Sequence, residues 1–204
     1  MAVSMSLVRD REQLKRLLAV RSVRRGEFKL ASGLTSNVYV DAKLTTLHAP
    51  AMPLVGRLFL DRIREHQWKP RAIGGLVLGA DPIVSAVARE SVDDDSPIDA
   101  FLVRKDAKKH GLEKFIEGVN EPAGLAVVIV DDVCTTGGST AEAIEKARSA
   151  GMVVLGAICL VDREEGAEER LMKLGCAFDR VFRLTELLEA YESGELVGAQ
   201  TSDI

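Results

Sequence analysis

The sequence predicts an α/β fold in which helices cover both faces of a central parallel sheet. From residue 72 onward, short and almost entirely apolar segments alternate with segments whose apolar residues recur at helical spacing. Strands of a parallel sheet covered on both faces are apolar along their whole length, whereas half-exposed antiparallel strands alternate with polar residues. The length of 204 residues, without a repeat or a low-complexity linker, fits one such domain.

The N-terminal region predicts two helices and two extended segments. Helical spacing of leucines predicts a first helix over residues 7–20. Extended segments are expected at residues 27–30 and 38–42, joined by a loop whose composition of Ser, Gly, Thr and Asn is typical of turns, at residues 32–37. A second helix, with an apolar stripe, is expected over residues 51–66.

The rest of the chain supplies the alternating elements of the sheet. Strands are expected at residues 72–78, 98–103, 126–130, 153–161 and 180–183. Helices are expected at residues 82–90, 139–150 and 165–174. Open parallel sheets bind their ligands beyond the carboxyl ends of the strands. The residues that follow each apolar segment are therefore the candidates for a functional site.

The composition excludes several classes of function. Aromatic residues make up 4% and the net charge is −4, which argues against a stacking platform or a cationic surface for nucleic acid. The apolar runs are far shorter than the roughly 20 residues of a membrane span, and we expect no secretory leader. Three cysteines without a C-x-x-C pair predict neither disulfides nor a zinc ribbon. We expect a cytoplasmic enzyme or small-ligand-binding domain without a nucleic-acid or membrane partner.

The most informative segment runs from residue 127 to residue 140. A buried strand leads there into Asp131 and Asp132, then into a loop of small and hydroxyl-bearing residues, then into a predicted helix. The N–H groups of such a loop and the positive end of the helix dipole suit a phosphate. Two carboxylates would repel a bare polyphosphate but accept hydrogen bonds from sugar hydroxyls. The segment predicts a ribose 5-phosphate site, with the hydroxyls on the acid pair and the phosphate on residues 135–140.

A capped helix start beside a turn aspartate is the plainer interpretation of a glycine loop. Neither the Walker pattern nor the dinucleotide G-x-G-x-x-G pattern occurs here. An apolar strand followed by Asp-Asp and then by Thr-Thr-Gly-Gly-Ser-Thr is much rarer than a glycine loop alone. This segment resembles the phosphoribosyl pyrophosphate (PRPP) motif of the type I phosphoribosyltransferases. The resemblance implies a parallel-sheet core with a small N-terminal hood, and transfer of ribose 5-phosphate from PRPP to a nitrogenous base with Mg²⁺. It implies a catalytic role for the acid pair and PRPP contacts for Asp131, Asp132, Val133, Cys134, Thr135, Thr136, Gly137, Gly138 and Ser139.

A cationic segment at residues 104–114 follows another predicted strand. A charge run is usually a solvated helix face, but a phosphate-rich ligand favours a loop that neutralises a departing diphosphate and excludes water. The segment is similar to the catalytic loop of the orotate phosphoribosyltransferases, which in that family reaches into the neighbouring subunit of a dimer. The resemblance places Lys108 at the catalytic lysine position, with Arg104, Lys105 and His110 against diphosphate oxygens.

Two further stretches resemble the same branch of the family. Residues 28–41 are similar to an N-terminal segment that closes over the base, and residues 161–166 to a strand end whose arginine holds the substrate. The resemblance assigns Arg163 and Thr135 to orotate, and a guanidinium offers forked donors to its carboxylate. An ion pair of Arg163 with a following glutamate is the plainer alternative.

One position departs from the family pattern. The strand and loop at residues 74–82 align with a loop that usually carries a lysine near the diphosphate, but Gly79 stands at that position and Asp81 follows. One cationic contact is therefore missing. We expect the domain to comprise a base-covering hood at about residues 1–45, an α/β core at about residues 46–190 and a tail at residues 192–204.

The resemblance as a whole implies an orotate phosphoribosyltransferase that converts orotate and PRPP into orotidine 5′-monophosphate and diphosphate, a step of de novo UMP biosynthesis. It implies a homodimer, and Mg²⁺ bound mostly through PRPP and water rather than by a cage of protein ligands. A phosphoribosyltransferase for another base is one alternative, but a purine has no carboxylate for Arg163. A non-catalytic PRPP-sensing regulator is another. The chain keeps Lys108 and a net charge of −4, both of which disfavour that alternative.

Overall fold

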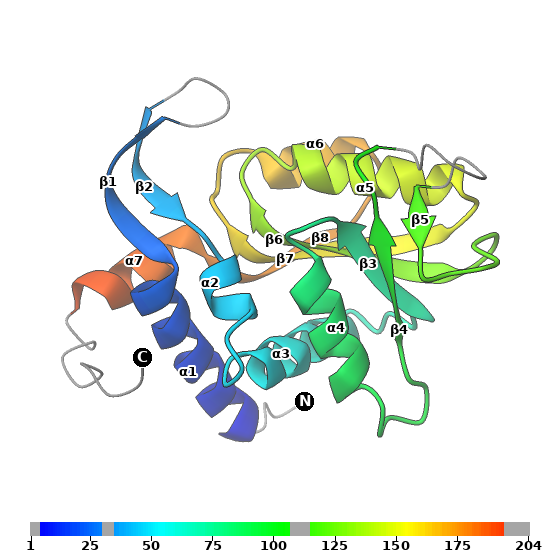
Figure 1. Ribbon diagram of the computed structural model, residues 1–204, viewed down its shortest axis with the longest axis horizontal. Helices are drawn as coiled ribbons and strands as arrows, with labels where there is room; N and C mark the ends of the chain where they lie inside the picture. Colours follow the sequence, from blue (N-terminus) through cyan, green and yellow to red (C-terminus); the bar gives the residue numbers. More distant parts are fainter. Residues whose placement is uncertain (1–4, 30–34, 107–114, 194–204) are drawn as a thin grey trace.

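The central sheet has six strands in the order β5-β4-β3-β6-β7-β8 in the computed structural model, which describes residues 5–29, 35–106 and 115–193 (Figure 1). Neighbouring strands are parallel except β4 and β5, which are antiparallel. The strands are β3 (Ala72–Leu76), β4 (Asp99–Val103), β5 (Ile116–Glu117), β6 (Ala126–Cys134), β7 (Val153–Asp162) and β8 (Phe178–Arg183). The prediction of an α/β fold with a central, mainly parallel sheet is confirmed.

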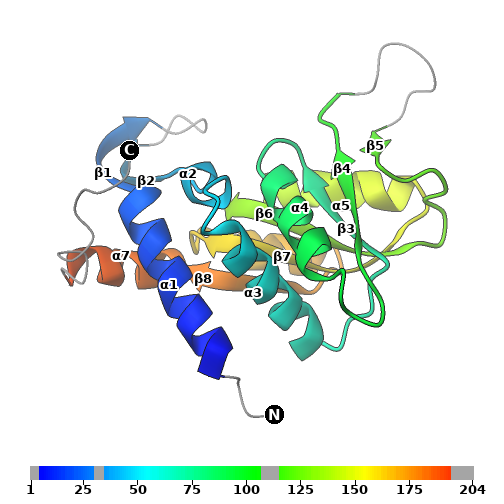
Figure 2. The ribbon, with the colours of Figure 1, turned by 60° about the horizontal axis from the view of Figure 1, so that its bottom comes forward.

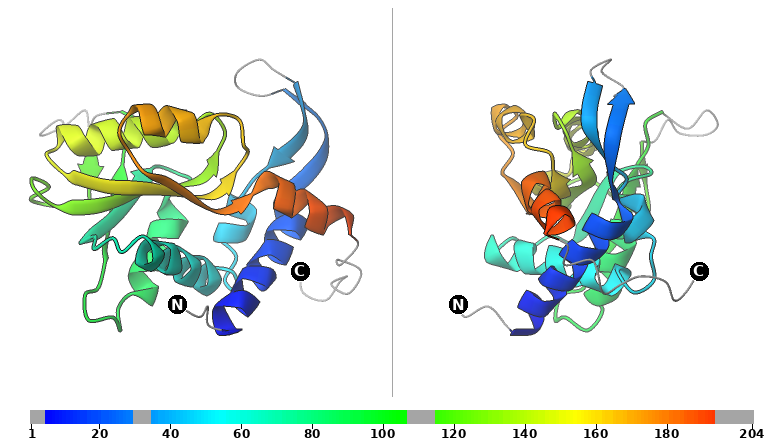
Figure 3. Two further views of the ribbon diagram at one scale, coloured as in Figure 1. Left: turned by 180° about the vertical axis from the view of Figure 1, so that it is seen from behind. Right: turned by 90° about the vertical axis from the view of Figure 1, so that its left-hand side faces the viewer.

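Helices cover both faces of the sheet (Figure 3). One face carries α5 (Gly138–Ser149) and α6 (Ala167–Lys173), and the other carries α3 (Met52–Glu65) and α4 (Asp81–Glu90). Successive residues of β6 point to opposite faces, so that Val127 and Ile129 pack with α5 while Val128 and Val130 join the cluster that includes α3 and α4. This double burial explains why the strand is apolar without alternation.

A two-stranded antiparallel hairpin stands apart from the sheet (Figure 2). It consists of β1 (Val23–Lys29) and β2 (Thr35–Val40), and it follows α1 (Met5–Arg21). Two buried leucines of α1, Leu14 and Leu18, belong to the main hydrophobic cluster. The N-terminal helix is thus packed into the core, while the hairpin after it projects toward the carboxyl edge of the sheet.

Several boundaries differ from the expected ones. β6 continues to Cys134 although its apolar run ends at Val130, because its backbone stays paired with β7 as far as Cys134 and Asp162. The sequence suggested that the acid pair follows the strand, but the pair lies within it. Three elements were not predicted: α2 (Lys43–Thr46), β5, and α7 (Leu184–Glu192). In the described part of the chain, no helix is both long and apolar enough to cross a membrane.

The strand order places a topological switch between β3 and β6. The chain runs outward from β3 to β4 and β5, then returns to the other side of β3 to form β6 and β7. The connections leaving β3 and β6 therefore part in opposite directions, which opens a crevice at the carboxyl ends of these two strands. The fold thus presents the last residues of β6 and the β3–α4 connection to a common site.

Candidate active site

Asp131 and Asp132 lie at the switch point, near the carboxyl end of β6, and they are only 7% and 9% exposed. The Oδ2 atom of Asp131 accepts a hydrogen bond from Thr140 Oγ1 at 2.8 Å, and its Oδ1 atom accepts one from the backbone N–H of Asp132 at 3.0 Å. Burial and the charge of Asp132 nevertheless raise the pKa of Asp131 to about 7. The pair is an accumulation of negative charge that its surroundings compensate incompletely.

Asp132 faces two different parts of the chain. Its Oδ1 atom accepts a hydrogen bond from the N–H of Val133 at 2.9 Å, and Lys43 Nζ lies 3.5 Å from its Oδ2 atom. A Cβ atom added to Gly79 would stand 2.4 Å from Asp132 Oδ1. The β3–α4 connection therefore passes directly against this carboxylate, and the departure noted at residue 79 has a structural reason.

Lys43 is a residue of the site that the sequence did not indicate. It opens α2, and its Nζ atom lies 2.9 Å from Asp41 Oδ1 as well as near Asp132. Partial burial opposes its charge, but the two aspartates outweigh this and raise the pKa of the ammonium. A lysine directly after the extended segment predicted at residues 38–42 was the available signal, but its partner on β6 is visible only in the fold.

The loop between β6 and α5 forms the expected cradle. Gly137 adopts a left-handed conformation with φ of 72°, and no side chain caps the helix that starts after it. The first N–H groups of a helix lack partners within the helix, so they are available to an anion here. The hydroxyl-bearing Thr136 and Ser139 are exposed, whereas the side chain of Cys134 is buried against Thr140. Cys134 could contribute to such a site only through its backbone.

Arg163 connects the end of β7 with the hairpin. Its Nη2 atom donates to Ser36 Oγ at 3.2 Å and its Nη1 atom to the carbonyl of Val38 at 3.4 Å, both on β2. Its Nε atom also donates to Glu165 Oε1 at 2.9 Å. Arg163 thus forms the ion pair with a following glutamate that was the plainer alternative, and it also contacts the segment expected to cover the base. Its own N–H donates to the carbonyl of Cys134 at 2.8 Å, which ties this strand end to the cradle loop.

The base of the cationic segment is anchored to α5. Lys146 Nζ donates to the carbonyls of Arg104 and Lys105 at 2.9 and 2.7 Å, and it stacks over the ring of Phe115. Arg104 itself pairs with Glu117 at 3.3 Å. The predicted catalytic Lys108 and His110 fall outside the described residues.

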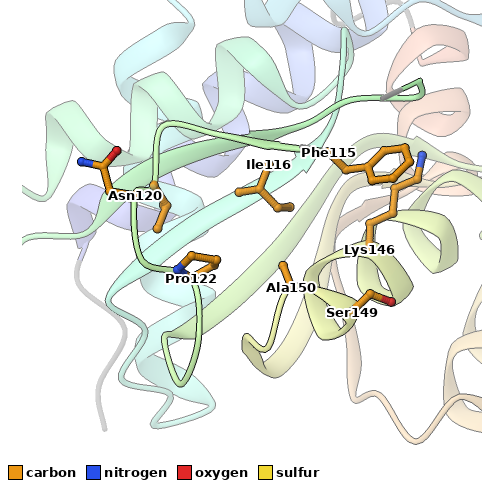
Figure 4. Close-up of a pocket in the computed structure, with 8 residues that line it drawn as sticks. Phe115, Ile116, Asn120, Pro122, Lys146, Ser149 and Ala150 are labelled. Atoms are coloured by element: carbon orange, nitrogen blue, oxygen red, sulfur yellow. The ribbon is translucent and has the colours of Figure 1, made fainter. Parts of the chain in front are cut away.

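An apolar cavity near this segment lies away from the acid pair. It has a volume of about 310 Å³ and is shown in Figure 4. It lies between the β5 region and the C-terminal half of α5, and it is lined by Phe115, Ile116, Val119, Asn120, Pro122, Lys146, Ser149 and Ala150. These residues come from the sheet edge and not from the carboxyl ends of β3 and β6, so this cavity is not the predicted ribose phosphate site.

The carboxylate at the end of the neighbouring strand β7 already has a charged partner, whereas Asp81 Oδ1 is buried without a hydrogen-bond partner in the described part of the chain. Asp162, at the end of β7, is 2% exposed and lies 3.1 Å from Arg180 Nη1. No group of three or more His, Cys, Asp or Glu side chains is placed to hold a metal ion within residues 5–29, 35–106 and 115–193. The acid pair is thus the place where added positive charge would relieve the most repulsion.

Comparison with known proteins connects this geometry to a family. Residues 44–178 match the model of the phosphoribosyl transferase domain. The chain is 42% identical to an orotate phosphoribosyltransferase of Aquifex aeolicus, covering 89% of this chain and 100% of that protein, and 40% identical to one of a Nostoc species, covering 89% and 87%. It is also similar to the crystal structure of Mycobacterium tuberculosis H37Rv orotate phosphoribosyltransferase in complex with PRPP, with a TM-score of 0.73, 36% identity, and coverage of 87% of this chain and 98% of that one.

Proposed function

We propose that the acid pair and glycine loop of this chain, which belongs to the orotate phosphoribosyltransferase family, bind PRPP for transfer of ribose 5-phosphate to orotate. The products of this reaction are orotidine 5′-monophosphate and diphosphate. The observation that carries the proposal is the position of two buried, adjacent carboxylates beside an uncapped helix start at the switch point of the sheet.

Asp131 and Asp132 accept hydrogen bonds from the 2′- and 3′-hydroxyls of the ribose, and residues 135–140 hold its 5′-phosphate. Charged acceptors are suited to neutral hydroxyl donors, and the phosphate is met by N–H groups and the positive end of the α5 dipole. Holding both ends of the pentose fixes the anomeric carbon relative to the sheet. The Thr140 hydrogen bond keeps Asp131 Oδ2 oriented and leaves Asp132 to face the crevice.

The cationic segment neutralises the leaving diphosphate. Cleavage at the anomeric carbon passes through an oxocarbenium-like state while negative charge grows on the leaving group, so donors placed around that group lower the barrier. Lys108 is assigned the catalytic role, and Arg104, Lys105 and His110 contact the diphosphate. Lys146 supports the assignment of Arg104 and Lys105, because it fixes their backbone carbonyls to the helix that holds the phosphate.

The base binds between the β7 end and the hairpin. Arg163 offers forked donors to the orotate carboxylate, and Thr135 contacts the ring. The contacts of Arg163 with Ser36 and Val38 support this proposal, because they bring the charge of the β7 end beneath the segment expected to cover the base. We assign that covering role to a hood of about residues 1–45, over a core of about residues 46–190.

Mg²⁺ is the cofactor that the family implies, and two adjacent carboxylates are a donor set that fits it. Burial and the charge of Asp132 raise the pKa of Asp131, so a cation nearby would stabilise the ionised pair. When bound, the ion would supply positive charge to the diphosphate oxygens of the donor. Asp131 and Asp132 are the residues that would face it, through water or the ribose hydroxyls. The chain itself orients the pentose, excludes water with its cationic segment and holds the base for attack.

The deciding experiment is to follow orotate consumption by ultraviolet absorbance with PRPP and Mg²⁺. Orotate-dependent turnover and diphosphate release are expected, with little turnover of uracil or hypoxanthine. Preference for a purine would indicate a phosphoribosyltransferase for another base, and PRPP binding without any turnover would indicate a non-catalytic regulator. Lys108→Ala should lower kcat by orders of magnitude with a modest change in PRPP affinity. Equal turnover of this variant would exclude the assigned role.

We further propose that the enzyme is a cytoplasmic homodimer whose cationic segment acts in the neighbouring subunit. Mixing inactive Lys108→Ala with inactive Asp131→Asn tests this arrangement. Hybrid dimers would contain one site with both residues intact, so activity should reappear after subunit exchange. A mixture that stays inactive, while size-exclusion chromatography shows that dimers have exchanged, would place the segment and the acid pair of one site on the same chain.

A further inference from the structure

The β3–α4 connection lacks room for a side chain at the point where it meets the acid pair. The nearest atoms to a Cβ built on Gly79 are Oδ1 and Cγ of Asp132, at 2.4 and 2.7 Å. Real Cβ atoms do not approach so closely, so a lysine here would have to displace the carboxylate. Positive charge beside this loop must therefore come from another element.

Lys43 brings positive charge to the same carboxylate from a different element, α2. Its Nζ atom lies 3.5 Å from Asp132 Oδ2, while Gly79 lies against Oδ1. The short helix that carries it is anchored by a buried hydrogen bond of 2.7 Å between Thr45 Oγ1 and Ser22 Oγ. The lysine side chain is 41% exposed, so the ammonium is held at the crevice and remains accessible to a ligand.

The charges around Lys43 are unbalanced in the absence of a ligand. Asp41 and Asp132 both contact its ammonium, and Asp131 adds a third carboxyl group next to Asp132. A single lysine that serves only as an ion-pair partner needs one carboxylate. If an anion entered the crevice together with a cation, the cation would neutralise part of the charge of the aspartates. The Lys43 ammonium could then also contact the anion.

We propose that Lys43 is a ligand of the diphosphate group of PRPP, and that it replaces the cationic contact which Gly79 cannot provide. This inference rests on the proposed function, because it assigns a further residue to the same donor site. The ammonium exchanges part of its contact with Asp132 for a diphosphate oxygen when the donor enters. Its position on α2 makes the region after the hairpin a participant in donor binding.

Two parts of the donor provide separate probes. Isothermal titration of the full-length chain with inorganic pyrophosphate and with ribose 5-phosphate, each with Mg²⁺, compares the two ends of the site. Lys43→Met should weaken pyrophosphate binding by about 10- to 100-fold, the range for one charge-assisted hydrogen bond, and leave ribose 5-phosphate within about twofold. Lys43→Arg should retain most of the pyrophosphate affinity.

A purely structural role for Lys43 gives the opposite pattern. If the lysine only positions Asp132, its removal should weaken ribose 5-phosphate, which depends on that carboxylate, as much as pyrophosphate. That result, or unchanged pyrophosphate affinity in Lys43→Met, would overturn the proposal. Failure of the unsubstituted chain to bind ribose 5-phosphate would instead overturn the proposed function, and with it this assignment.

A matched control is available on α1. Lys15 Nζ lies 2.8 Å from Glu12 Oε2, so Lys15→Met also removes a lysine–carboxylate pair, but one outside the site. It should leave both affinities unchanged. Lys43→Gln, whose side chain is one bond shorter and keeps hydrogen-bonding capacity but not charge, replaces Lys43→Met if thermal unfolding shows that the methionine variant is not folded. In turnover assays it should raise KM for PRPP about 10-fold or more and leave KM for orotate within about twofold.

Discussion

The ends of β6 and β7 are neighbours in the sheet and both carry a buried aspartate, yet the two carboxylates have different surroundings. Asp162 on β7 pairs with Arg180 and accepts the N–H of Glu164 at 2.8 Å. Asp131 on β6 has a threonine and a backbone N–H as partners, and its nearest charged neighbour, Asp132, is of the same sign. At β6, burial and the charge of Asp132 raise the pKa of Asp131 to about 7.

This difference separates a structural carboxylate from one available to a ligand. A buried charge with a guanidinium partner and a hydrogen bond is complete, and removal of either partner leaves the other uncompensated. Two adjacent buried carboxylates repel one another, so folding alone gives no reason to place them together. The repulsion at the β6 end is therefore what the proposed donor site would explain, whereas the β7 end needs no such explanation.

The largest expected effect is on turnover at the β6 end. Replacing both carboxylates in Asp131→Asn/Asp132→Asn should lower kcat/KM by about 100- to 10,000-fold, because two charged hydrogen bonds to the ribose are lost. The free energy of unfolding should stay the same or rise, since a repulsion is removed. Initial rates and urea unfolding measure the two quantities. Normal turnover, or a marked loss of stability, would mean that the acid pair is structural.

The converse effect is expected at the β7 end. Asp162→Asn removes a buried ion-pair partner of Arg180 and should lower the free energy of unfolding by about 1.5–3 kcal/mol. Turnover per folded molecule should change only a few-fold. Urea unfolding and active-site titration of the folded fraction separate these contributions. A large fall in kcat of fully folded protein would bring Asp162 into the mechanism and erase the contrast between the two strands.

A pH series sharpens the comparison. The folded-state pKa of Asp131, about 7, exceeds the ordinary aspartate value of about 4, so the folded state binds an extra proton between these values. Stability should therefore fall as pH rises from about 4 to about 7. In Asp131→Asn this component is absent, so the Tm of the variant relative to the parent should rise over that interval. A difference that is independent of pH would contradict the assigned pKa.

The smallest effect is expected at the hydrogen bond that steadies Asp131. Thr140→Val removes a donor whose bond to Oδ2 holds down the pKa of Asp131, so that pKa should rise further. Activity should fall a few-fold, most strongly near the acidic end of the pH range, because fewer molecules carry the ionised carboxylate. The pH profile of kcat/KM measures the shift. Thr140→Ser should behave like the parent chain, since it keeps the hydroxyl.

The sheet was predictable because its strands are buried on both faces. Each apolar run from residue 72 onward corresponds to an observed strand, and α5 begins within one residue of its expected start at residue 139. β5 escaped prediction because two residues show no periodicity. α7 was not predicted although its sequence carries a signal, since Leu184, Leu187 and Leu188 recur at helical spacing.

The candidate site was predictable where its residues are consecutive in the chain. Asp131 and Asp132 adjoin the cradle in sequence, so one segment indicates both. Lys43 and Gly79 belong to the site through the fold alone, because folding brings α2 and the β3–α4 connection to the same carboxylate, Asp132. The absence of a lysine at residue 79 was visible in the sequence, but its cause, the approach of a carboxylate, was not.

The pairing pattern of β6 has a further consequence. β3 is in register with it only as far as Gly74 and Ile129, whereas β7 accompanies it to Cys134. Beyond that point the two strands are no longer in register, although β3 and the connection after it stay close: a Cβ atom added to Gly75 would stand 2.0 Å from the carbonyl oxygen of Val130, and one added to Gly79 would stand 2.4 Å from Asp132 Oδ1. The interrupted ladder therefore lets the chain leave the sheet alongside the acid pair, and it does so at residues where a side chain would collide with β6.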